Sequence, residues 1–71
     1  MLANPSADAV YLEDCECKHD TENAILVDIP DMGEDTWVPR SQVHDDSEVV
    51  NSGDRGTLAI TLWFATKLGL R

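Results

Sequence analysis

The sequence predicts a mainly β (α+β) fold, with four to five short antiparallel strands forming a small half-open barrel of SH3-like or OB-like kind, closed by a short C-terminal helix. Three observations support this fold class. Runs rich in β-branched and aromatic residues alternate with turns that contain Pro, Gly and Asp. Each run is short, and short curled sheets protect their edges by partial closure. The last apolar run, unlike the others, is flanked by residues suited to capping a helix.

The strongest strand signal is Ala24–Ile29 (AILVDI), which is almost continuously apolar and predicts the central strand. A tight acidic connection follows over Pro30–Asp35, because Pro30 cannot donate to a sheet ladder and Gly33 accepts a positive φ. Thr36–Arg40 then returns as the next strand, so the two runs predict a hairpin. The residues of this hairpin expected to face the core are Ile25, Val27 and Trp37.

The first 23 residues predict an arm, a strand and a turn. Residues 1–8 are polar, and we expect a flexible N-terminal arm there, followed by a single small domain over 9–71. Ala9–Lys18 predicts a strand and His19–Asn23 a polar turn. The residues of this strand that share one face by alternation are Tyr11, Cys15 and Cys17.

The middle of the chain predicts only short elements. Pro39 places the end of the preceding strand at an edge or a bulge. Ser41 is suited to capping one helical turn, and Glu48–Val50 predicts a short strand. Residues 51–56 contain two glycines and predict a turn.

The C-terminal segment predicts a strand that runs directly into a helix. Thr57–Thr61 alternates as a strand whose last residue is a suitable N-cap, and the helix is expected over 62–68 with Gly69 just beyond its end. Trp63 and Phe64 are adjacent and cannot both face inward in one direction. Packing in the core is one use for this pair, and a weak apolar contact with a partner is the other.

The size of the chain argues against catalysis. Its 71 residues make one domain with one small core, which leaves few apolar residues to line a deep pocket. There is no glycine-rich phosphate loop, and the thiols and imidazoles lie in an acidic setting that raises a thiol pKa. We therefore expect that the protein is not an enzyme and has no catalytic residues.

The charge predicts the kind of partner. The chain has 14 acidic and 5 basic residues, for a net charge of −9, and every acidic residue lies in residues 1–54. Such a field repels nucleic acid and anionic membranes and attracts basic protein surfaces. No apolar run approaches the length of a membrane span, and the N-terminus lacks the features of a signal peptide. We expect a cytoplasmic protein, in the host cytoplasm if it is encoded by a phage.

The two cysteines and two histidines suggest a zinc site as a weaker alternative to structural thiols. Two cysteines only two residues apart cannot link distant parts of the chain, so nothing argues for an oxidising compartment. The pattern C-x-C-x-H spans about 13 Å on an extended strand, which is too far for one metal without a bend. No cofactor is expected. The ligands for the alternative are Cys15, Cys17, His19 and His44, with Asp14 or Asp20 as weaker ones.

The acidic clusters are the main candidate for a binding surface. Neither of them has the spacing of an EF-hand calcium loop. Carboxylates spread over a small rigid β scaffold can imitate a track of phosphates and so occupy the nucleic-acid-binding groove of another protein. Solubility and a saline habitat are alternative reasons for the acidity, and both stay open. The expected acidic face comprises Asp28, Asp31, Glu34, Asp35, Asp45, Asp46 and Glu48.

Residues 24–70 resemble a set of small uncharacterised proteins from phages, prophages and bacteria. The shared elements are an apolar strand, here Ala24–Ile29, then W-[IV]-P-[KR]-S-Q at Trp37–Gln42, an acidic corner, a G-x-x-G turn at Gly53–Gly56, and W-x-A-x-K-x-G-L from Trp63 to Leu70. Phe64 beside Trp63 departs from that pattern. The resemblance implies a common fold and a phage or mobile-element origin, and it carries over no functional residue.

The leading hypothesis is a non-enzymatic, phage-encoded inhibitor that binds a basic, nucleic-acid-binding surface of a host defence complex of anti-CRISPR or anti-restriction type. The second is a small structural or accessory domain that forms a homo-oligomer through the edge near Pro39 and the surface of Trp63 and Phe64. The third is a zinc-stabilised domain.

Overall fold

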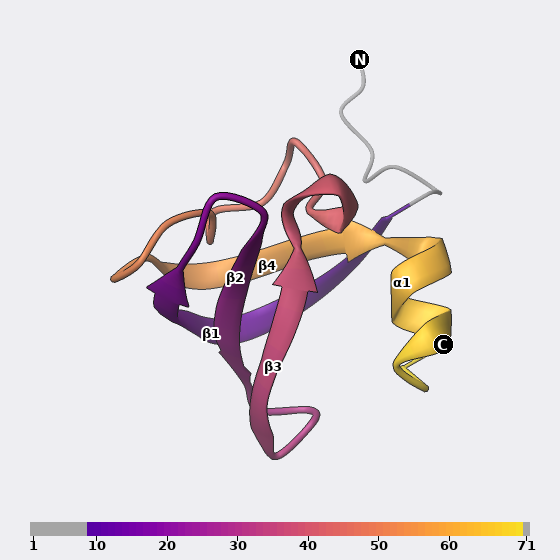
Figure 1. Ribbon diagram of the computed structural model, residues 1–71. Helices are drawn as coiled ribbons and strands as arrows, with labels where there is room; N and C mark the ends of the chain where they lie inside the picture. Colours follow the sequence, from indigo (N-terminus) through magenta and orange to yellow (C-terminus); the bar gives the residue numbers. More distant parts are fainter. Residues whose placement is uncertain (1–8, 71) are drawn as a thin grey trace.

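The computed structural model describes residues 9–70, which contain four antiparallel strands in one sheet followed by a short helix (Figure 1). The mainly β fold class with a closing C-terminal helix is therefore confirmed. The expected arm over residues 1–8 lies outside the described residues. Neighbouring strands are hydrogen-bonded in the order β3-β2-β1-β4 across the sheet. The elements are β1 (Ala9–Asp20), β2 (Ala24–Ile29), β3 (Glu34–Pro39), the 3-10 turn η1 (Arg40–Gln42), β4 (Arg55–Thr61) and α1 (Leu62–Lys67).

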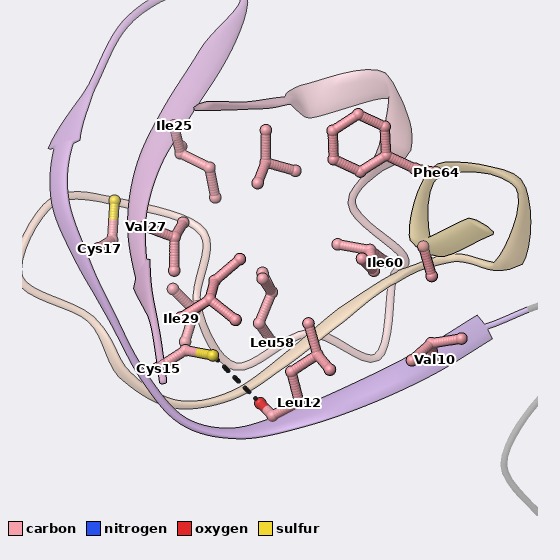
Figure 2. Close-up of a cluster of buried hydrophobic side chains, with 13 residues drawn as sticks. Val10, Leu12, Cys15, Cys17, Ile25, Val27, Ile29, Leu58, Ile60 and Phe64 are labelled. Atoms are coloured by element: carbon pink, nitrogen blue, oxygen red, sulfur yellow. Dashed lines mark hydrogen bonds between the residues drawn. The ribbon is translucent and has the colours of Figure 1, made fainter. Parts of the chain in front are cut away.

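The sheet curves around one core of buried side chains (Figure 2). The connection after η1 runs along the outer edge of β4, where Val43 bridges Ile60 and the His44 N–H donates to the Ala59 carbonyl oxygen at 2.8 Å. This connection covers the β4 edge, while β3 remains an edge strand, so the sheet is open on its β3 side. The core consists of Val10, Leu12, Cys15, Cys17, Ile25, Val27, Ile29, Val38, Val49, Leu58, Ile60, Phe64 and Ala65.

Strand β1 contains a bulge that reverses which residues face the core. Its register against β4 shifts between Leu12 and Cys15, and Asp14 has φ +61°. One extra residue in a strand moves every later side chain to the opposite face. Val10 and Leu12 are therefore buried before the bulge, and the two cysteines after it. The expectation that Tyr11 shares a face with the cysteines was wrong for this reason.

The hairpin of β2 and β3 confirms the predicted strand Ala24–Ile29 but corrects the orientation of its partner. Val38 lies opposite Ile25 and is fully buried, whereas Trp37 lies opposite Leu26 on the outward face. The expectation that Trp37 faces the core was wrong because alternation allows only one of two neighbouring residues to point inward. Strand β3 also begins at Glu34, two residues earlier than expected.

The segment 40–50 differs from its prediction in two respects. Ser41 is not an N-cap, because η1 begins after Pro39 and has no side-chain cap bond. Glu48–Val50 is not a strand. Instead, the Ser47 hydroxyl accepts a hydrogen bond from the Ala59 N–H at 3.1 Å. In a regular strand pair the Ala59 N–H would donate to a backbone carbonyl oxygen. Here a side-chain hydroxyl accepts this hydrogen bond instead, and such side-chain bonds compete with regular strand pairing.

Helix α1 has the predicted cap at each end but is one residue shorter than expected, because Leu68 is the C-cap. The Thr61 hydroxyl accepts a hydrogen bond from the Phe64 N–H at 3.2 Å. At the C-terminus, Gly69 has φ +84°, and the Leu70 N–H donates to the Ala65 carbonyl oxygen at 2.9 Å, as in a Schellman motif.

Candidate functional site: an acidic and aromatic sheet face

The first group of predicted acidic residues gathers at one end of the β2–β3 hairpin. Asp28 is near the end of β2, Asp31 is in the turn, and Glu34 and Asp35 begin β3. We call these four residues the hairpin-tip acids. Within residues 9–70 none of them forms an ion pair. Their carboxylates are therefore not used to hold this part of the fold together.

The second group, the corner acids Asp45, Asp46 and Glu48, lies on the connection that follows the β4 edge. Two of these carboxylates accept hydrogen bonds from other parts of the protein. Asp46 Oδ2 accepts a hydrogen bond from the Tyr11 hydroxyl at 2.8 Å, and Glu48 Oε1 accepts one from the Thr57 N–H at 2.8 Å. The hairpin tip belongs to the opposite edge of the sheet. The seven predicted residues thus form two separate groups.

The outward face of the sheet adds an acidic residue that sequence reasoning missed. Glu16 on β1 lies directly opposite Asp28 on β2, and Asp28 lies directly opposite Asp35 on β3. Three carboxylates therefore form one row across three adjacent strands. No local pattern singles out Glu16, because its place in this row depends on the bulge in β1.

Within residues 9–70, the ion pairs of this row are all formed by Glu16, its residue on β1. Arg55, opposite Glu16 on β4, places its Nε 3.9 Å from Glu16 Oε1, and Lys18 Nζ is 4.0 Å from the same oxygen. Both pairs are long and exposed, so each stabilises the fold by about 0–1 kcal/mol. The β2 and β3 part of the row has no such partner among the described residues, which leaves the field there negative.

Aromatic and aliphatic side chains form the next row on the same face. His19 on β1 lies opposite Leu26 on β2, which lies opposite Trp37 on β3. The rings of His19 and Trp37 are 6.2 Å apart, centroid to centroid, at 86°, an edge-to-face contact. Trp37 is 50% exposed. We define the sheet-face site as these two rows, comprising Glu16, Asp28, Asp35, His19, Leu26 and Trp37.

The predicted apolar pair at the start of α1 separates into one core and one surface residue. Phe64 is buried in the core, so it is not available to a partner, and this part of the expected contact surface was wrong. Trp63 is 62% exposed, and Lys67 Nζ lies 4.9 Å from the centroid of its ring. The aromatic face of Trp63 therefore already receives a cation from its own helix.

The two thiols form hydrogen bonds within the irregular strand β1. The Cys15 Sγ donates to the Leu12 carbonyl oxygen at 3.4 Å, across the bulge (Figure 2), and the Cys17 Sγ donates to the His19 carbonyl oxygen at 3.2 Å. A second register shift, between Cys17 and His19, places the imidazole on the outward face. Within residues 9–70 no group of three or more His, Cys, Asp or Glu is arranged to hold a metal ion.

The environment of the thiols keeps them protonated. Burial is the main cause that raises the pKa of Cys15 from 9.0 to about 11, and the nearby carboxylates of Asp31, Asp28 and Asp14 add to the effect. Burial also raises the pKa of Cys17. Because the thiolate is the nucleophile and the metal ligand, both groups are poor at either task near neutral pH.

A hollow lies beside η1. It is lined by Arg40, Val43, His44, Asp45 and Val50. The guanidinium of Arg40 donates from Nε to the Thr21 carbonyl oxygen at 2.9 Å and from Nη1 to the Val50 carbonyl oxygen at 3.0 Å. These two hydrogen bonds link the turn between β1 and β2 to the loop that precedes β4, and they occupy two donors of the guanidinium beside the hollow.

Comparisons of this chain with protein-family models, with curated proteins and with solved structures each found no match. Among residues 9–70, no helix has the length and apolarity needed to cross a membrane. The sheet-face site is therefore defined by its geometry and its charge.

Proposed function

We propose that this protein is a non-enzymatic, acidic protein-binding module, encoded by a phage, that occupies the basic, nucleic-acid-binding surface of a host defence complex of CRISPR or restriction type. We place its binding surface at the part of the sheet-face site that lies next to the hairpin-tip acids. The resemblance of residues 24–70 to small phage and prophage proteins supports the origin. The net charge of −9 supports a basic partner.

The observation that carries the proposal is the row formed by Glu16, Asp28 and Asp35. Like charges directly opposite each other on neighbouring strands destabilise a sheet. Natural proteins break such local rules mainly at functional sites. An acidity needed only for solubility can be spread over the loops without this loss of stability, so the row favours a binding role over general solubility.

The arrangement suits a surface that normally holds nucleic acid. Lys and Arg that pair with phosphates also pair with carboxylates, and a guanidinium takes either one bidentately. A rigid sheet presents its carboxylates at fixed spacing without an ordering cost on binding. The protein then competes with DNA or RNA for one groove.

The test is affinity capture from a bacterial lysate treated with nuclease, followed by competition. We expect the immobilised protein to retain a nucleic-acid-binding complex, duplex DNA to displace it, and added salt to weaken the interaction. The purified complex should lose its DNA binding when the protein is added. The variant Asp28→Asn/Asp35→Asn should lose most of this inhibition.

The matched control is Glu13→Gln/Glu22→Gln, which removes the same charge from two exposed positions outside the row. If inhibition falls equally in both variants, net charge alone is responsible and the sheet face is not the site. Capture that is indifferent to salt, or that retains no nucleic-acid-binding protein, would contradict the proposed function.

Self-association through α1 is a second candidate, favoured by the exposure of Leu62 and Trp63 side by side at the start of the helix. In that case sedimentation should show a dimer that dissociates in the variant Trp63→Gln. A strict monomer at high concentration would rule it out.

A further inference from the structure

We propose that Trp37 is the anchor of the sheet-face site and that it receives an arginine side chain from an extended segment of the protein partner. This inference rests on the proposed function and specifies the chemistry of the partner. The segment it fits carries arginine at alternate positions, one guanidinium over Trp37 and the next at the row of Glu16, Asp28 and Asp35.

Trp37 is exposed but held in place. Half of its surface is accessible although it lies within a strand, and the edge-to-face contact with His19 together with the neighbouring Leu26 limits its movement. A large aromatic side chain fixed in this way loses little conformational freedom when a partner covers it. Tryptophan is also enriched among the residues that dominate binding energy at protein interfaces.

The other exposed tryptophan shows what distinguishes Trp37. The ring of Trp63 already has Lys67 Nζ above it, at 4.9 Å from its centroid. Among residues 9–70 no cation lies over the ring of Trp37. Trp37 is also placed beside carboxylates, whereas the segment around Trp63 has no acidic residue. A cationic ligand is therefore attracted to Trp37 by both the ring and the field around it.

The spacing of the two rows favours an extended ligand. Asp35 and Trp37 are two residues apart on β3 and share its outward face, so they are separated by about 7 Å along the strand. Alternate side chains of an extended partner have the same separation. When one arginine stacks on Trp37, the next one on the same side of the partner segment reaches the carboxylates of Asp35 and Asp28.

The chemistry of the site favours arginine over both lysine and nucleic acid. A planar guanidinium can stack on the indole and bind a carboxylate through two N–H groups, while an ammonium is a compact, strongly hydrated charge. A nucleic acid base could stack on Trp37, but its phosphates would then approach the row of carboxylates. The ligand is therefore a basic protein segment.

The experiment uses the full chain with Trp63→Phe, so that Trp37 is the only tryptophan. Two labelled peptides of equal length and charge, one repeating Arg-Ser and the other Lys-Ser, are titrated by fluorescence anisotropy and by the emission of Trp37. We expect the arginine peptide to bind more tightly and to change the Trp37 emission. Trp37→Leu, which keeps an apolar side chain without a π face, should weaken binding by about 3- to 30-fold.

A second variant, Trp37→Thr, keeps a strand-favouring residue and should show the same loss, and circular dichroism checks that each variant is folded. The control Trp63→Gln in the original sequence should bind like the unchanged protein. Equal binding of the two peptides, or unchanged binding after both Trp37 substitutions, would overturn the inference. A Trp37 emission that changes on dilution alone would also overturn the inference, because it would indicate self-association through this face. A Trp37 emission that changes on addition of oligothymidine would overturn it in favour of a nucleic acid ligand.

Two combinations of results distinguish a failure of this inference from a failure of the proposed function. If the Trp37 variants still inhibit the captured complex while Asp28→Asn/Asp35→Asn does not, the anchor is wrong and the proposed function stands. If the arginine peptide binds through Trp37 but no nucleic-acid-binding complex is captured, the anchor stands and the proposed function is wrong.

Discussion

Asp28 on β2 lies directly opposite Asp35 on β3, on the outward face of the sheet and next to the exposed ring of Trp37. The β2–β3 hairpin, which has the strongest strand pattern in the sequence, therefore places two negative charges directly opposite each other. This repulsion is not relieved by an ion pair at either residue within the described part of the chain. The pair thus weakens the hairpin and at the same time creates the most negative part of the site.

Removing one charge of this pair should stabilise the protein. We expect Asp28→Asn to raise the free energy of unfolding by about 0.2–1 kcal/mol at low ionic strength, because the repulsion across β2 and β3 disappears. Urea unfolding measures the change. The gain should shrink in high salt, which screens the repulsion in the original protein. Glu22→Gln, in the turn after β1, is the control and should change little, and a lower stability of Asp28→Asn would contradict the prediction.

Replacing Arg40 by lysine should destabilise the protein by about 0.5–2 kcal/mol, because the ammonium cannot make both hydrogen bonds that the guanidinium donates to exposed carbonyl oxygens. The guanidinium connects Thr21, in the β1–β2 turn, with Val50, and it also lies 3.8 Å from Asp20. A lysine ammonium retains the charge but cannot supply the fork of N–H groups that reaches both loops. Thermal unfolding measures the loss.

The matched control for Arg40→Lys is Arg55→Lys. The Arg55 side chain is 77% exposed and makes one long ion pair, so this change should stay within about 0.5 kcal/mol. Equal effects of the two substitutions would show that Arg40 contributes only its charge.

Gly56→Ala should destabilise the protein more than Gly53→Ala does. Both glycines have positive φ, +139° and +92°, so an alanine is strained at either place. Only at Gly56 would the new Cβ meet another group, Glu48 Oε1, at 2.6 Å. The Glu48 carboxylate can swing away, but it then no longer accepts the exposed hydrogen bond from the Thr57 N–H, which should add about 0.5–1.5 kcal/mol.

A double-mutant cycle with Glu48→Ala tests the origin of this additional loss. In that background the difference between the two alanine variants should largely disappear. If it persists in full, the contact with Glu48 is not its cause.

The buried thiols should make stability fall at high pH. The pKa of Cys15 is raised to about 11 in the folded state, from an ordinary value of 9.0. Between these values the unfolded chain has lost the proton while the folded protein still binds it, so the free energy of unfolding decreases as pH rises from about 9 to 11. Below pH 9 this contribution is fully present. Urea unfolding across this range measures the decrease, which should be smaller in Cys15→Ala.

The same burial predicts slow chemistry at the thiols. At pH 8, alkylation of the folded protein should be much slower than alkylation of the urea-unfolded chain, because little thiolate is present and access is blocked. Equal rates would show that β1 opens easily around its bulge.

Much of the fold was predictable because its signals are local. The strand Ala24–Ile29 and the caps of α1 depend on residues adjacent in sequence, and each is present as predicted. The clustering of the acids at the hairpin tip also follows from local sequence, because these residues lie within or close to the short connection between two strands. The strand expected over Glu48–Val50 failed because the Ser47 hydroxyl, a side-chain group, replaced a backbone partner.

The sequence by itself determined the mainly β class, the hairpin, the caps of the helix and the excess of acidic charge, since each follows from residue type and short-range spacing. Only the tertiary structure decided which residues form the site. The bulge at Asp14 sets the faces of β1, and a second shift sends His19 outward while Cys17 stays buried. The pairing of three strands then aligns Glu16 with Asp28 and Asp35, and His19 with Trp37. Register decides these neighbours because a shift of one residue moves every later side chain to the other face of the sheet.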